Sequence, residues 1–124
     1  MIVADTDAFI DLLRAEGAHR KLAGLMRSRR LATTAITLFE VWKGLESDAD
    51  REVARRAFRG VRVYPVSDAA ARRAAEIHRL LRQSPIGDRD TLIAGVCLAI
   101  QRPLLTANLR HFRRVPGLEV LAAR

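Results

Sequence analysis

The sequence has 124 residues, the length of one ordinary domain, and 49% of them are hydrophobic although only 5% are aromatic. This composition excludes a disordered chain and predicts a core of Leu, Ile, Val and Ala side chains. The net charge of +8, from 22 Lys and Arg against 14 Asp and Glu, favours a polyanionic partner such as nucleic acid, although a genome that prefers Arg to Lys codons would give the same bias.

Short apolar runs alternate with helical patterns along the chain. The runs that predict strands are 1–4, 31–35, 61–66, 104–105 and 118–121. The patterns that predict helices are 8–14, 18–30, 36–46, 51–59, 67–82 and a last, largely apolar one that opens at 88–90 and ends at 100. A polar turn is expected at 110–112. The alternation predicts a single α/β domain over 1–124, with a short, mostly parallel sheet flanked by helices in three layers.

Several familiar functions have no support in the sequence. The three His residues are far apart and there is one Cys, so a zinc site is disfavoured. There is no GxSxG motif, Walker lysine or GxGxxG loop. Cys97 lies in the apolar helix and is expected to be a core residue. The longest apolar run, 92–100, is too short for a membrane span of about 20 residues, and no signal peptide is evident, so a soluble cytoplasmic protein is expected.

Polar residues follow two predicted strands and open the apolar helix. Asp5 follows the first strand, Asn108 follows the strand at 104–105, and Asp90 lies in the first turn of the last helix. Strand carboxyl ends and the helix starts after them share one edge of such a sheet, so the three are expected to meet there. Clustered acids are stable around a hard dication such as Mg²⁺ or Mn²⁺. Helix capping explains Asp5 and Asp90 equally simply, and both interpretations stay open on this evidence.

Two further features are ambiguous. Glu40 projects roughly opposite the apolar stripe of its helix, so periodicity alone predicts a solvated surface acid. The densest basic run is either a phosphate-facing patch or a solvated helix face, and the solvated face is slightly favoured. Its members are Arg51, Arg55, Arg56, Arg59 and Arg62.

Four segments, in order, resemble the PIN-domain ribonucleases, and more narrowly the VapC toxins of bacterial toxin–antitoxin pairs. The start, IVADTDAFIDLL, is similar to the opening strand and DT-x-x-x-I motif of that family. TTAITLFEVWKGL is similar to the segment that carries its second acid. RDTLIAGVCLAI resembles its D-x-x-IA helix, and LLTANLRHFRRVPGLEVL resembles its T-x-N-x-x-x-F-x-x-V-x-G-L ending. Each motif is weak alone, but four in order across nearly the whole chain are strong.

The resemblance implies a PIN-like fold in which Asp5, Glu40 and Asp90 bind metal and Asn108 takes a fourth, variable position. It therefore places the Glu40 side chain in the metal-binding cleft of the family, whereas periodicity predicts a solvated surface position. Asn108 is a neutral ligand, which would hold a second metal weakly or only with substrate present. Relatives commonly carry Asn or Ser where this chain has Asp7, which either helps bind or only caps its helix. Asp88 is interpreted as a helix cap and is the main rival to Asp90 as ligand.

The function implied by the resemblance is a Mg²⁺-dependent endoribonuclease that cuts structured RNA such as tRNA or ribosomal RNA. It further implies a homodimer and a VapB-like antitoxin whose segment fills the cleft, with promoter DNA bound only through the toxin–antitoxin complex. The alternative is a non-catalytic module that binds nucleic acid or a protein through its basic surface. Nothing in the sequence names the RNA target.

Overall fold

The computed structural model describes residues 1–124 and contains one five-stranded sheet. The strands are β1 (Ile2–Ala4), β2 (Leu31–Thr34), β3 (Arg62–Tyr64), β4 (Leu104–Thr106) and β5 (Val120–Ala122). Their order in the sheet is β3-β2-β1-β4-β5, and every neighbouring pair is parallel. The predicted α/β class is confirmed, and the sheet is wholly rather than mostly parallel. All five carboxyl ends therefore lie at one edge, called here the carboxyl edge.

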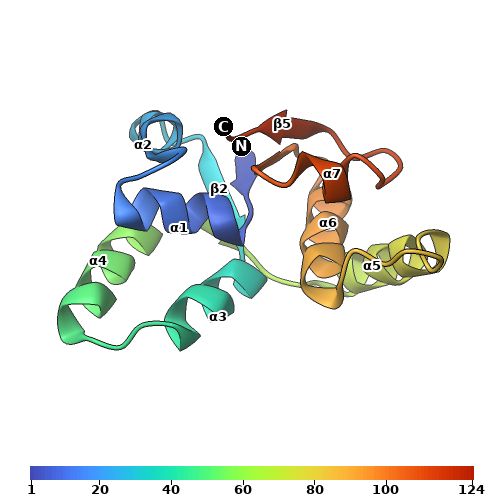
Figure 1. The fold of residues 1–124 in the computed structure, drawn as a ribbon, viewed down its shortest axis with the longest axis horizontal. Coiled ribbons are helices and arrows are strands. Elements are labelled where there is room, and N and C mark those ends of the chain that lie inside the picture. Colours follow the sequence, from blue (N-terminus) through green and yellow to red (C-terminus); the bar gives the residue numbers. More distant parts are fainter.

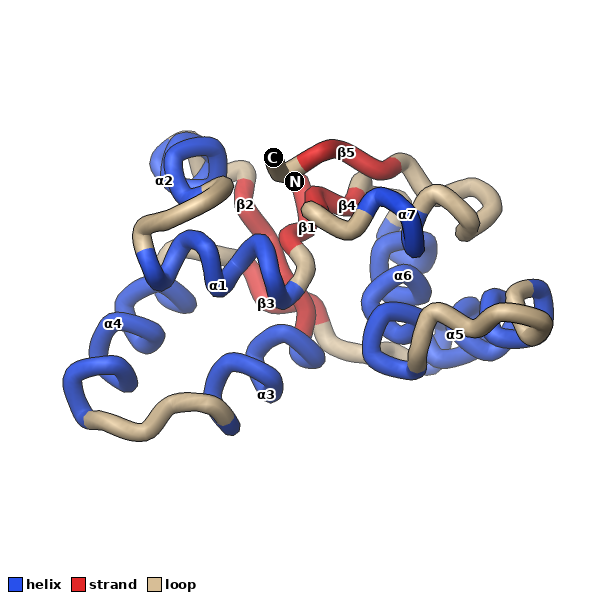
Figure 2. The backbone as a smooth tube through the Cα atoms, in the orientation of Figure 1, coloured by secondary structure: helices blue, strands red, loops and turns tan.

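Seven helices surround this sheet. They are α1 (Thr6–Arg14), α2 (His19–Arg27), α3 (Ala35–Lys43), α4 (Asp48–Arg59), α5 (Asp68–Leu80), α6 (Asp88–Ile100) and α7 (Leu109–Phe112). Figures 1 and 2 show α1, α2 and α4 on one side of the sheet and α5 and α6 on the other, with α3 below the end of β2. The layered arrangement expected from the sequence is therefore present. No helix is long and apolar enough to cross a membrane.

The two faces of the sheet contribute side chains to two separate hydrophobic cores, because successive strand residues point in opposite directions. Val3 and Leu104 pack with α5 and α6, whereas Ala4 and Leu105 pack with α1 and α2. This explains why β1 and the first two residues of β4 are apolar at every position: both faces are covered there. Cys97 lies in the first core and is fully buried, as predicted.

Several predicted elements have other bounds in the structure, and the differences are clearest at α1, α4 and α7. Helix α1 begins at Thr6 rather than at residue 8, because Asp5 is its N-cap. Helix α4 begins at Asp48 rather than at residue 51, because Ser47 caps it, so the polar stretch interpreted as a break is the helix start. Residues 110–112, predicted as a polar turn, belong to the short helix α7.

Candidate active site

Asp5 is fixed at the carboxyl edge by two hydrogen bonds. It directly follows β1 and caps α1, where its Oδ1 accepts the backbone N–H of Ala8 at 3.0 Å. Its Oδ2 accepts the hydroxyl of Thr106, the last residue of β4. The side chain is nearly closed off from solvent, with 4% of the residue exposed. Two neighbouring parallel strands thus hold one carboxylate in a single orientation.

Asp90 occupies the first turn of α6 and is also buried, with 7% of the residue exposed. Its Oδ2 lies 3.3 Å from His111 Nδ1, and its Oδ1 lies 3.5 Å from Arg89 Nε. The Asn108 amide nitrogen lies 2.8 Å from the same His111 nitrogen. His111 Nδ1 accepts from Asn108 when it is unprotonated and donates to Asp90 when it carries a hydrogen. Asp90 and Asn108 are therefore linked through His111, a residue that the sequence analysis placed only in a turn.

The two buried acids act on each other electrostatically. The pKa of Asp5 is raised from 3.8 to about 6, mainly by burial and further by the charges of Asp7 and Asp90, although the hydrogen bonds from Thr106 and Ala8 act to lower it. Desolvation and like charge both disfavour a carboxylate. The site therefore carries negative charge that a cation would offset. The predicted meeting of Asp5, Asp90 and Asn108 at one edge agrees with these contacts.

Glu40 is not part of this group. Its carboxylate forms an ion pair with Lys43 at 3.0 Å on α3, and 18% of its side chain is exposed, so the solvated surface position expected from periodicity is wrong. Instead, Glu40 lines a cleft of about 260 Å³ between α1, α3 and α4, called here the helical cleft. No set of three or more His, Cys, Asp or Glu side chains lies close enough to share a metal ion. A ligand role for Glu40 stays a prediction.

The other two acids near the edge are both exposed. Asp7 lies in the first turn of α1 and Asp88 is the first residue of α6. The cap of α6 is Gly87, with no side-chain bond, so the interpretation of Asp88 as the cap is wrong. Asp90 is the buried acid of its pair, and this makes it the better candidate for a fixed ligand.

Buried threonines complete the site, and the sequence analysis did not single them out. Thr106 holds Asp5, and its hydroxyl oxygen also accepts the backbone N–H of Asn108 at 2.9 Å. Thr6 on α1 and Thr37 on α3 are hydrogen-bonded at 3.1 Å between their hydroxyls. One feature of the sequence could have identified Thr106 as a site residue: it lies at the end of a strand, two residues before Asn108.

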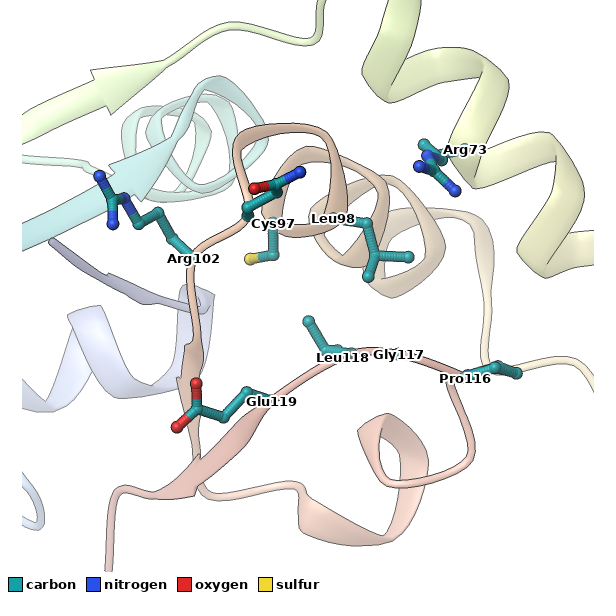
Figure 3. Close-up of a pocket in the computed structure, with 9 residues that line it drawn as sticks. Arg73, Cys97, Leu98, Arg102, Pro116, Gly117, Leu118 and Glu119 are labelled. Atoms are coloured by element: carbon teal, nitrogen blue, oxygen red, sulfur yellow. The ribbon is translucent and has the colours of Figure 1, made fainter.

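A second cavity near α6 lies away from these acids. It has a volume of about 390 Å³ and adjoins the carboxyl end of α6, whereas Asp90 is at the other end. Figure 3 shows the Cys97 sulfur directed toward it, with Arg102 and Glu119 at its margin. Burial raises the pKa of the Cys97 thiol to about 12. The thiol is therefore neutral at physiological pH and unsuited to nucleophilic catalysis.

The chain matches a known protein family. The PIN domain model matches residues 2–118, and the chain belongs to the PIN domain family. Within it, the chain is 34% identical to Ribonuclease VapC10 of Mycobacterium tuberculosis over 115 residues, covering 90% of this chain and 86% of that protein. It therefore belongs with the VapC proteins.

Two other similar proteins extend this comparison. The chain is 26% identical over 122 residues to the tRNA(fMet)-specific endonuclease VapC of Salmonella typhimurium, covering 94% of this chain and 92% of that protein. Among solved structures, DNA-bound VapBC from Salmonella typhimurium matches with a TM-score of 0.83 and 25% identity, over 99% of this chain and 98% of that one. The fold is thus that of VapC proteins along the whole chain.

Asp5→Asn is expected to stabilise the metal-free protein at neutral pH. Folding raises the pKa of Asp5 to about 6, so the folded state binds this proton more tightly than the unfolded state. The stability of the parent should therefore fall as the pH rises from about 4 to 6, by up to about 3 kcal/mol, since each pKa unit corresponds to about 1.4 kcal/mol. Asn still caps the helix and lacks this charge.

The measurement is the melting temperature in EDTA between pH 4 and pH 8. At pH 7.5 the variant should melt several degrees above the parent, and this gap should close toward pH 4. A variant that melts below the parent at pH 7.5 would contradict this and support a purely capping role for Asp5.

Proposed function

We propose that this chain is a Mg²⁺-dependent endoribonuclease and the toxin of a type II toxin–antitoxin pair. The observation that carries the proposal is the buried pair Asp5 and Asp90 at the carboxyl edge of the sheet, in a chain similar to proteins named VapC ribonucleases. The substrate we propose is structured RNA, either tRNA or ribosomal RNA. The name of the Salmonella relative, a tRNA-specific endonuclease, supports the first.

The residues present suit a small hard cation. Carboxylate, hydroxyl and amide oxygens meet at this edge, and Mg²⁺ prefers oxygen ligands while keeping several waters, so two carboxylates are sufficient protein ligands. Asp5 and Asp90 would hold the ion, Glu40 would join them from α3, and Mn²⁺ would serve as a substitute. When bound, Mg²⁺ supplies charge stabilisation at the phosphate and lowers the pKa of a water.

The side chains orient the ligand carboxylate, accept the proton of the attacking water and contact the RNA. Thr106 and the N–H of Ala8 fix Asp5, so its orientation does not have to be established during the reaction. Asp90 or Glu40 orients the attacking water and accepts its proton, directly or through a further water. The water oxygen bonds to phosphorus as the P–O bond to the leaving group breaks, and solvent protonates the leaving oxygen. Arg89, beside Asp90 and partly exposed, contacts the RNA backbone.

A VapB-like antitoxin is the proposed partner. The helical cleft has apolar walls from Ile10, Leu13 and Val53, and Phe39 and Val53 are exposed to solvent. An amphipathic antitoxin segment could cover these apolar surfaces and reach Glu40. We further propose a homodimer, and binding to promoter DNA only through the toxin–antitoxin complex. The Salmonella VapBC structure, solved bound to DNA, supports the last point.

The testing experiment is cleavage of total cellular RNA by the purified, antitoxin-free chain with Mg²⁺, with Mn²⁺ or with EDTA. Cleavage by metal-activated water needs a divalent ion and forms no 2′,3′-cyclic phosphate, so both the yield and the product ends are informative. Metal-independent cleavage that leaves cyclic phosphates would contradict the proposal. Tight RNA binding in EDTA without cleavage in any metal would instead favour the non-catalytic module.

Glu40→Gln is expected to lower cleavage at least about 100-fold, the usual range for losing a positioned acid or base. Lys43→Gln is the matched control, because it breaks the same ion pair and leaves Glu40 in place. The measurement is the single-turnover rate, with the melting temperature taken alongside. Equal rates in both variants would show that Glu40 is only a partner of Lys43.

A further inference from the structure

A basic concavity lies at the edge of the sheet opposite the acids. It has a volume of about 470 Å³ and is lined by Met1, Met26, Leu31, Gly60 and Val61 together with four arginines. These arginines, called here the distal arginine patch, are Arg27, Arg29, Arg59 and Arg62. Arg27 and Arg29 come from the end of α2 and the turn that follows it, and Arg59 and Arg62 come from the end of α4 and the start of β3, on either side of a second turn. Because the strands are parallel, both turns lie at the edge where the strands begin, called here the amino edge.

Direct packing holds the two turns together. A methyl group added at Gly60 would lie 3.0 Å from the Met26 sulfur, so the turn after α4 contacts the end of α2 without space for a side chain. The floor of the concavity is apolar, with Leu31 buried and Met1 and Val61 half-buried. Two segments distant in the sequence therefore bring four cations around one apolar floor.

These four arginines have no acidic partners. None of them takes part in any ion pair of the structure, whereas three other arginines of α4 do: Arg51 pairs with Asp48, and Arg55 and Arg56 pair with Glu52. The basic run of the sequence thus divides in two. Its first part is the solvated helix face that was favoured, and its last two members, Arg59 and Arg62, join the distal arginine patch.

The backbone at Arg29 is unusual. Its φ is +58°, in the left-handed region where Gly or Asn is favoured at the end of a helix. An arginine at this position therefore adopts a backbone conformation that carries a local cost. Arg62 also stacks over the Tyr64 ring, with its guanidinium carbon 4.8 Å from the ring centroid, so its fork is partly ordered without any salt bridge.

We propose that the distal arginine patch binds the phosphate backbone of RNA, away from the site of cleavage. Guanidinium forks match phosphate oxygens, and four unneutralised cations suit a ligand with regularly repeated anionic charge. The apolar floor would contact sugars or an unstacked base. The inference rests on the proposed function, since it makes one RNA the ligand of both edges. It implies a substrate large enough to extend across the domain.

The test is RNA binding in EDTA, where no metal-dependent cleavage occurs. Fluorescent tRNA, one of the proposed substrates, is titrated with the parent, Arg59→Gln/Arg62→Gln and the matched control Arg55→Gln/Arg56→Gln, at several salt concentrations. The control removes the same charge from the same part of the chain. Losing two phosphate contacts should reduce the log–log salt slope by about 1.4 to 1.8 and weaken affinity about tenfold, whereas the control should retain the parent slope. Equal losses in both variants, or none in either, would overturn the proposal.

Arg29→Gly separates binding from folding. Glycine suits the left-handed backbone, so the melting temperature should not fall while RNA affinity should. Cleavage of the same RNA adds an independent readout, because Arg59→Gln/Arg62→Gln should raise KM about tenfold with little change in kcat, the pattern of lost uniform binding. Unchanged binding and KM in these variants would refute the patch and leave the nuclease proposal standing. Absence of cleavage by the parent would refute the nuclease proposal while the EDTA measurement still tests the patch.

Discussion

Asp90→Asn should lower the rate of RNA cleavage at least about 10³-fold, the loss expected when a fixed acid that both orients water and holds the ion becomes neutral. Asp90 is buried in the first turn of α6 and is linked through His111 to Asn108. Asparagine has the same shape, so the fold should be kept. The measurement is the single-turnover rate in Mg²⁺, with circular dichroism to confirm folding.

Asp88→Asn is the matched control for this prediction. Asp88 lies two residues earlier in the same helical turn, is exposed, and forms no side-chain hydrogen bond or ion pair. Its replacement removes the same charge from the same helix end and should change the rate only slightly. If the Asp88 variant lost activity and the Asp90 variant kept it, the ligand assignment would have to be exchanged.

Gly95→Ala should destabilise the protein by about 3 kcal/mol, the upper range for overpacking a closed contact. A methyl group at Gly95 would lie 2.5 Å from the Ala70 carbonyl oxygen and 2.9 Å from the Ala74 Cβ. Both atoms belong to α5, so the backbones of α5 and α6 approach at this position. Separating them would also disturb the helix that carries Asp90. Thermal unfolding should show a drop of about 10 °C.

Gly24→Ala provides the comparison for that variant. Gly24 lies within α2, and the nearest atom to an added methyl group is the end of the Arg27 side chain, 3.9 Å away. The same substitution should therefore raise stability by about 0.5–1 kcal/mol through better helix propensity. Similar melting temperatures for the two variants would mean that α5 and α6 are not packed as closely as described.

The sequence was most informative for residues whose position follows from the strand or helix next to them. Asp5 after an apolar run and Asp90 at the start of an apolar helix were placed correctly. Asp5 follows the carboxyl end of β1, and α6 leads back to the start of the parallel strand β4, so its own first turn lies at the carboxyl edge. Glu40 could not be placed by periodicity, since its helix is covered on two sides and borders the helical cleft. Its ligand role follows only from the family resemblance, and it stays a prediction.

The residues that the sequence analysis missed act across long separations. Thr106 bonds to Asp5 over 101 positions, and His111 meets Asp90 over 21. Neither has a distinctive local pattern, because a threonine in a strand and a histidine in a turn are ordinary. The division of the basic run, by contrast, has a local signal, because Arg51, Arg55 and Arg56 each follow Asp48 or Glu52 by three or four residues on one helix.

The central claim is that the carboxyl edge around Asp5 and Asp90 holds the divalent ion on which RNA cleavage depends. The most direct measurement is a Mn²⁺ titration of the antitoxin-free chain, in which bound metal is followed by electron paramagnetic resonance and total RNA cleavage is measured in the same samples. Cleavage should rise in proportion to metal occupancy, and the Asp5→Asn variant should lose both together. Undiminished cleavage in the absence of bound metal, or full metal binding by Asp5→Asn, would contradict the account.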